Sequence, residues 1–448
     1  MKKMLIHNAK IINEGKSFTG SVLIKDGNIE KIFREEVPEK ILKENTTIEA
    51  EGLWLIPGAI DEHVHFREPG LTEKADIESE SRAAVTGGVT SFMDMPNCKP
   101  QTTTLELVEQ KCEIAEKKSL ANYSFYLGAT KDNIAEIKKI DKRNICGVKL
   151  FMGSSTGNML VDETEKLSEI FAESPVIIAT HNEDTDIINQ NAERLKSELG
   201  EDIPVKYHPA IRSEEACYRS TAKAVELAKK HNAKLHVMHI STAKELSLFD
   251  NKKTLSEKRI TAETCPQYLL FSDEDYERLG AKIKCNPAIK TANDRNALQK
   301  ALTSNIIDTI GSDHAPHLPK DKEGNALTAT SGMPLIQFSL LAMLDLVKKG
   351  TLTRETLVEK MCHNPAIIYN ISKRGFIRKG YRADLVLIDP NKQTIVNEND
   401  IQSKCGWSPF CGMTFNAKIT HTIVNGNIVY ENGEIHSEHK GERLTFDR

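Results

Sequence analysis

Residues 58–70 read GAIDEHVHFREPG, an apolar run that ends in two alternating histidines, an arginine and a Pro-Gly turn. The run predicts a buried β-strand, and alternate side chains of a strand share one face. We therefore expect His63, His65 and Arg67 to point the same way. Neutral imidazoles bind zinc and its first-row neighbours, so the histidine pair predicts a metal site at the end of this strand.

Seven more apolar runs follow, and polar segments of helical length separate most of them. The runs cover residues 89–97, 122–130, 145–153, 175–183, 233–241, 259–271 and 307–317. Eight buried strands that alternate with helices predict an α/β fold, a (β/α)8 TIM barrel over residues 56–375. An open doubly wound sheet is the alternative, but no Gly-rich phosphate loop follows any of the runs.

Both ends of the chain have a different pattern, with short strands and tight turns. Residues 1–55 contain an Asp-Gly pair at 26–27, and residues 376–448 contain Asn-Gly pairs at 425–426 and 432–433. Such pairs between apolar runs are strong β-hairpin signals. We expect the two ends to form one small discontinuous β-sandwich domain beside the catalytic barrel.

Charge and composition exclude several classes of protein. The 448 residues carry a net charge of −4, spread along the chain, so we expect no nucleic acid or membrane partner. No apolar run approaches the roughly 20 residues that span a bilayer, and the start lacks a signal peptide's apolar region. Nine cysteines without a CxxC pair are typical of reduced thiols. These features predict a cytoplasmic protein with a small-molecule ligand.

A TIM barrel places reactive residues at the C-terminal ends of its strands. Polar groups collect at or just beyond seven of the eight predicted strand ends. They are His63, His65, Arg67, Asn97, Lys149, His181, His239, Asn286, Asp313 and His317. Singly, His181 or His239 is more often a hydrogen-bonded core histidine, and Asp313 an ordinary turn residue. Together with the first pair, we interpret them as metal ligands, with Asp313 also a general base.

Lys149 lies among apolar residues of the fourth predicted strand. A buried ammonium is costly and has no lone pair for a metal. Its side chain either extends out of the strand end or reacts with CO₂ to form a carbamate that bridges two metal ions. We favour the carbamate.

Arg67 is either part of a surface salt bridge or a ligand for an anion. Its planar fork of donors matches a carboxylate. Its place two residues beyond the histidine pair favours an anionic substrate.

Seven motifs along the predicted barrel carry a family resemblance. They are HVHFREPG (63–70), MPNCKP (95–100), GVKLFM (147–152), THNE (180–183), HVMHIST (236–242), NPAIK (286–290) and SDHAPH (312–317). With GFIRKGYRADLVLIDP (375–390) and SKCGWSPFCGMTF (403–415), nearly the whole chain resembles the dihydroorotases of the amidohydrolase superfamily. The resemblance implies a hydrolase that reversibly cyclises N-carbamoyl-L-aspartate to L-dihydroorotate in pyrimidine biosynthesis, and a homodimer.

The resemblance also implies roles for single residues. His63 and His65 would bind one zinc ion together with Asp313. His181 and His239 would bind a second, and a carboxylated Lys149 would bridge the two. Asp313 would exchange a proton with the hydroxide shared by the ions. The implied substrate contacts are Arg67, Asn97 and His317 for the carboxylate, and Asn286 and the backbone of Met333 for the ring.

Two alternatives remain open. The motifs GVKLFM, AETCPQYL and SGMP also resemble hydantoinases, which like allantoinases lack an arginine at the place of Arg67. A catalytically inactive scaffold relative would show broken metal ligands, whereas all six positions are filled here. The small-residue stretch 153–158 is either a lid or a plain turn.

Overall fold

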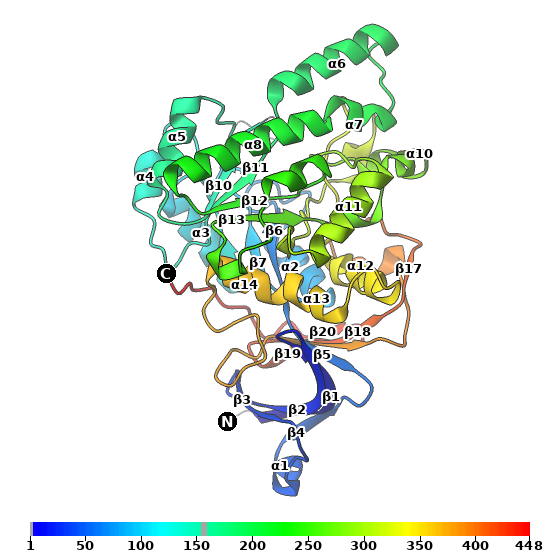
Figure 1. The fold of residues 1–448 in the computed structure, drawn as a ribbon. Coiled ribbons are helices and arrows are strands. Elements are labelled where there is room, and N and C mark those ends of the chain that lie inside the picture. Colours follow the sequence, from blue (N-terminus) through cyan, green and yellow to red (C-terminus); the bar gives the residue numbers. More distant parts are fainter. Residues whose placement is uncertain (1–2, 154–158) are drawn as a thin grey trace.

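A ring of eight parallel strand segments forms the centre of the computed structural model, which describes residues 3–153 and 159–448 (Figure 1). The strands are β6 (Ala59–Val64), β7 (Val89–Asp94), β8 (Asn122–Phe125) continued by β9 (Leu127–Gly128), β10 (Val148–Phe151), β11 (Ile178–His181), β12 (Leu235–Val237), β13 (Ile260–Thr264) and β14 (Thr309–Ile310). They pair in chain order, as a TIM barrel requires.

Backbone contacts join the ends of this ring. A parallel bridge links Val64 to His314, and the His65 N–H donates to the His314 carbonyl over 2.7 Å. Between β8 and β9, the Tyr126 N–H donates to Asp94 and the Leu127 N–H to Gly147. The segment just beyond β14 thus lies beside β6, and the predicted TIM-barrel class is confirmed.

Helices follow the strands and surround the barrel. They are α2 (Ile77–Thr86), α3 (Leu105–Lys118), α4 (Ile134–Lys138), α5 (Thr164–Glu173), α6 (Thr185–Leu199), α7 (His208–Ile211), α8 (Glu214–His231), α9 (Pro266–Leu270), α10 (Tyr276–Leu279), α11 (Ala292–Thr303), α12 (Ile336–Lys348), α13 (Arg354–Val358) and α14 (Asn364–Tyr369). The run expected as a strand over 259–271 is a strand only to Thr264. Pro266 starts α9 because proline suits the first turn of a helix.

Strands from both ends of the chain form one nine-stranded sheet below the barrel in Figure 1. They are β1 (Lys3–Asn13), β2 (Lys16–Lys25), β3 (Asn28–Phe33), β4 (Thr46–Glu49), β5 (Trp54–Pro57), β15 (Leu385–Asp389), β18 (Lys418–Val424), β19 (Asn427–Glu431) and β20 (Glu434–Ile435). The antiparallel pairing of β5 with β15 joins the two ends. The sheet has its own apolar core, including Ile6, Val22 and Leu387.

The Asp-Gly and Asn-Gly pairs form turns of this sheet. Asp26 and Gly27 join β2 to β3, and Asn425 and Gly426 join β18 to β19. All four residues have positive φ, from 49° to 80°, which the tight hairpin turn requires and which Gly and Asn adopt most readily. The predicted hairpins are confirmed.

Two parts of the C-terminal region contact the barrel instead of the sheet. Residues 403–407 contact α2 and the chain beyond β14. Residues 443–448 lie at the end of the barrel where the strands begin, and Leu444 and Phe446 are buried there with Tyr369. Across the two described ranges, no helix is both long and apolar enough to cross a bilayer.

We expect Phe446→Ala to lower the thermal unfolding midpoint. The side chain is 1% exposed, and replacing a buried phenylalanine by alanine costs about 3–5 kcal/mol because it leaves a cavity. The control is Leu199→Ala, a side chain 43% exposed. Equal midpoints for the two variants, followed by circular dichroism, would contradict this packing.

Candidate metal centre

The C-terminal ends of the barrel strands surround one polar cavity. Its lining residues are His63, His65, Arg67, Asn97, Lys149, Phe151, His181, His239, Asn286, Asp313, Ala315, Ser331 and Gly332. Nine of the eleven predicted site residues are among them. Of the other two, His317 contacts Arg67, whereas Met333 is buried beside the cavity wall.

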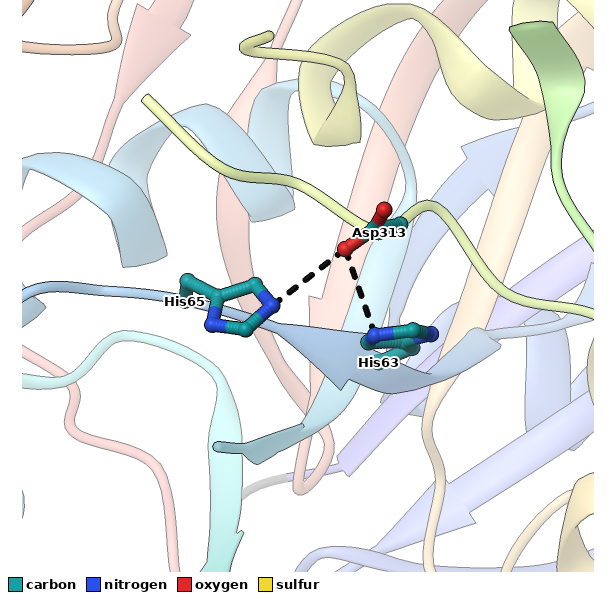
Figure 2. A group of neighbouring side chains, drawn as sticks. All are labelled: His63, His65 and Asp313. Atoms are coloured by element: carbon teal, nitrogen blue, oxygen red, sulfur yellow. Dashed lines mark ion pairs between the residues drawn. The ribbon is translucent and has the colours of Figure 1, made fainter. Parts of the chain in front are cut away.

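One group of donors brings together His63, His65 and Asp313. His63 lies on β6 and His65 just beyond its end, and Asp313 lies just beyond β14 on the neighbouring segment (Figure 2). The Nε2 atom of each histidine lies 3.2 Å from Asp313 Oδ1. The three donor atoms lie within 4.8 Å of one another, close enough to bind one metal ion together.

Hydrogen bonds at the far side of each ring determine which nitrogen faces the cavity. His63 Nδ1 lies 2.7 Å from Glu263 Oε1, and His65 Nδ1 lies 2.7 Å from Asn97 Oδ1. Both oxygens are acceptors, so both Nδ1 atoms carry the proton. Each Nε2 lone pair is therefore free, as a metal ligand needs.

A second group lies across the cavity on β11 and just beyond β12. His181 Nδ1 lies 2.9 Å from His239 Nε2. His181 Nε2 donates to Glu183 over 3.1 Å, and Arg212 donates to the same carboxylate over 2.5 Å. The Glu183 carboxylate thus leaves His181 Nδ1 free to bind a metal ion.

Burial suits these groups to bind cations. It lowers the pKa of His65 to about 4 and lowers that of His181 and His239 as well. All three rings are then neutral donors at pH 7. Burial would raise the pKa of Asp313, but His63 and His65 lower it, so Asp313 is an anion. Neutral imidazoles and a carboxylate fit a zinc-like divalent ion.

Lys149 on β10 lies between the two groups of donors on the cavity wall. It is 1% exposed, and its amine lies 3.0 Å from the Met238 sulfur. No carboxylate of the described residues lies within 4.0 Å of that amine. Burial lowers the pKa of Lys149 to about 8, so an appreciable fraction is unprotonated near neutral pH.

Three site residues adopt left-handed backbone conformations. The φ angles are 68° at Arg67, 43° at His239 and 49° at Asp313. Such conformations cost free energy for residues other than glycine, and they concentrate at functional sites. The backbone here turns sharply where β6, β12 and β14 end.

The side of the cavity around Arg67 is cationic. Arg67 is 7% exposed; it donates to the Pro316 carbonyl, and its Nη2 lies 3.0 Å from His317 Nε2. Lys74 Nζ lies 3.1 Å from His317 Nδ1 and forms an ion pair with Asp321 Oδ2, also over 3.1 Å. Among residues 3–153 and 159–448, no carboxylate lies within 4.0 Å of the Arg67 guanidinium.

Three further residues orient the ligands and were not predicted from the sequence, namely Glu263, Glu183 and Arg212. Glu183 lies in the motif THNE and Glu263 in the motif AETCPQYL. Neither motif by itself shows that its glutamate is the partner of a histidine.

The predicted role of Met333 has no support in the cavity lining. Its carbonyl accepts from the Ala315 N–H, and Ser331 and Gly332 line the cavity instead. A substrate contact by Met333 stays a prediction. Residues 154–158 of the candidate lid lie outside the described residues.

Comparison with known proteins identifies the family. A model of the amidohydrolase family matches residues 54–429. The chain belongs to the amidohydrolase family. This amidohydrolase is 30% identical to a dihydroorotase of Methanosarcina acetivorans, with 98% of this chain and 94% of that protein covered.

Other relatives of this amidohydrolase are named for different activities. It is 32% identical to an allantoinase of Bacillus velezensis, over 96% of this chain and 94% of that protein. A solved structure, the L-hydantoinase (dihydropyrimidinase) from Arthrobacter aurescens, is 30% identical. It superposes with a TM-score of 0.93 over 99% of this chain and 100% of that chain.

We expect Glu263→Gln to weaken metal binding by about 10- to 100-fold, because carboxylates that orient ligating histidines have effects of that size. Glutamine retains the volume but loses the charge that favours the Nδ1–H tautomer of His63. The measurement is metal retention during dialysis against a graded chelator series. Glu274→Gln, at an exposed position, is the control. Equal retention in both variants would contradict the orienting role.

Proposed function

We propose that this amidohydrolase is a dihydroorotase, which interconverts L-dihydroorotate and N-carbamoyl-L-aspartate. The observation that carries the proposal is the buried Arg67 guanidinium, which has no carboxylate partner among the described residues. Burial lowers its pKa to about 10, so it remains charged at neutral pH. A buried unpaired charge is costly, and an anionic ligand would offset that cost.

The neighbours of Arg67 support an anionic ligand. Arg67 and Lys74 carry only donors, and they lie at opposite nitrogens of the His317 ring. A neutral imidazole accepts at only one nitrogen. Lys74 is also paired with Asp321 over 3.1 Å, so Arg67 is the cation of this group that lacks a carboxylate partner among the described residues. Burial, Arg67 and Lys74 lower the pKa of His317. A carboxylate would accept hydrogen bonds from this group.

Asn97 links this cationic group to the metal ligands. Its Oδ1 accepts from His65, which leaves its amide N–H groups as donors on the cavity wall. A substrate held by Arg67 and Asn97 would thus lie beside His65. L-Dihydroorotate has a carboxylate on its ring, whereas hydantoin and allantoin have none. The charge of the site therefore favours dihydroorotase over the other two activities.

The proposed reaction uses the groups in the cavity. Two zinc ions, held by the histidines, Asp313 and a carboxylated Lys149, would activate water and polarise the ring carbonyl. Asp313 takes a proton from the attacking water and passes it to the ring nitrogen as the C–N bond breaks. Arg67 holds the substrate carboxylate throughout, and the reverse path closes the ring with loss of water.

The carbamate on Lys149 is part of this proposal. A neutral amine attacks CO₂, and the product is a carboxylate where a buried ammonium would be costly. With its pKa lowered to about 8 by burial, the neutral fraction of Lys149 rises as pH increases through 8.

We therefore expect carbamate formation in metal-free protein to accelerate from pH 6.5 to 8.5 at constant dissolved ¹³CO₂. The measurement is the growth of the ¹³C NMR signal of the carbamate after ¹³CO₂ is added to the metal-free protein. Lys149→Met should lack the signal. A rate that does not change with pH, or a signal that persists in Lys149→Met, would contradict the assignment.

Substrate choice tests the function itself. The wild-type protein loaded with zinc should open L-dihydroorotate and act much more slowly on hydantoin and allantoin. Arg67→Gln should lose about 2–4 kcal/mol of substrate binding, or roughly 30- to 1,000-fold in kcat/KM for L-dihydroorotate, because a charged hydrogen-bonded pair is broken. Arg278→Gln, at a residue 63% exposed, is the matched control. Faster turnover of hydantoin or allantoin than of L-dihydroorotate by the wild-type protein would overturn the proposal.

The homodimer implied by the family resemblance is also a proposal. Light scattering on the purified protein would test it, with twice the chain mass as the expected result.

A further inference from the structure

Residues 403–407, here called the strap, lie outside the barrel against the chain segment that carries Asp313 and His317. The Trp407 indole N–H donates to the His317 carbonyl over 2.7 Å. The ring of His317 in turn contacts Arg67 over 3.0 Å. One hydrogen bond therefore connects the strap to a side chain of the proposed carboxylate site.

The other end of the strap contacts the same segment through Glu80. Ser403 Oγ and the Lys404 N–H both donate to this fully buried carboxylate, over 2.6 and 3.0 Å. His314 Nε2 also donates to Glu80, over 2.7 Å. Since His314 lies between the lining residues Asp313 and Ala315, the strap supports the segment at two points.

Lys322 extends this support to the opposite wall. Its ammonium lies 5.8 Å from the centre of the Trp407 ring, within range of a cation–π contact. It donates to the carbonyls of Lys284, Thr330 and Gly332 over 2.7–3.0 Å. The Thr330 and Gly332 carbonyls lie on either side of Ser331, and the Lys284 carbonyl also accepts from the Gly332 N–H over 2.9 Å. Ser331 and Gly332 line the cavity.

We infer that Trp407 is a positioning residue for substrate recognition. It holds the His317 backbone so that the His317 ring and Arg67 are in place for the substrate carboxylate. The inference rests on the proposed function, because it names the carboxylate of that substrate. Trp407 is not among the residues that line the cavity, so its expected effect is on substrate binding and not on the proton transfers.

The test is Trp407→Phe, which keeps an aromatic ring but removes the indole N–H. Loss of a single hydrogen bond of this kind, about 0.5–1.5 kcal/mol, corresponds to a rise in KM for L-dihydroorotate of about twofold to twelvefold. We expect kcat within twofold of wild type, with zinc content unchanged and a thermal midpoint within a few degrees of wild type. The matched control is Trp54→Phe, at the other tryptophan of the chain, on β5, with KM unchanged.

A second measurement does not depend on the folding of the Trp407 variant. Trp54→Phe leaves Trp407 as the sole tryptophan, and titration with L-dihydroorotate should change its fluorescence with half-saturation near KM. An unchanged KM in folded Trp407→Phe, or equal losses in kcat and zinc content, would overturn the inference. The proposed function would still stand in that case if the wild-type protein turns over L-dihydroorotate. Absence of wild-type turnover of L-dihydroorotate would overturn both.

Discussion

A single carboxylate at the centre of the barrel connects three strands of the site. Glu263 on β13 accepts from His63 Nδ1 over 2.7 Å and from the His239 backbone N–H over 3.0 Å. The first contact leaves His63 Nε2 free for a metal ion, and the second holds the sharp turn after β12. Burial would raise the pKa of Glu263, but His63 and His236 lower it. The carboxylate therefore stays charged and can orient both groups.

The cavity above Glu263 has two electrostatic sides. One side carries neutral imidazoles and the Asp313 carboxylate, a donor set for cations. The other carries the Arg67 guanidinium beside His317, a donor set for an anion. A carboxylate-bearing cyclic amide matches both sides at once, since its ring amide would face the metal ligands while its charge faces Arg67. The separation of charge across the cavity thus supports a dihydroorotase more than fold or family membership does.

Much of this site could be predicted from local sequence pattern. Alternate residues of a strand, such as His63 and His65, share one face, and the parallel strands of a barrel all end at the same side. Glu263 could not, because a glutamate inside an apolar run has many structural explanations. Trp407 contacts a residue 90 positions earlier, and no local periodicity reports such a contact. The run over 259–271 shows the same limit, since apolar character alone did not reveal that α9 follows β13.

A crystal structure of the zinc-loaded protein with L-dihydroorotate, with anomalous data at the zinc edge, is the most direct test of this account. We predict zinc beside His63, His65 and Asp313 and beside His181 and His239, with the ligand carboxylate on Arg67. Zinc at the deeper cluster of Glu62, His236 and Glu263, or a ligand carboxylate directed away from Arg67, would contradict the account.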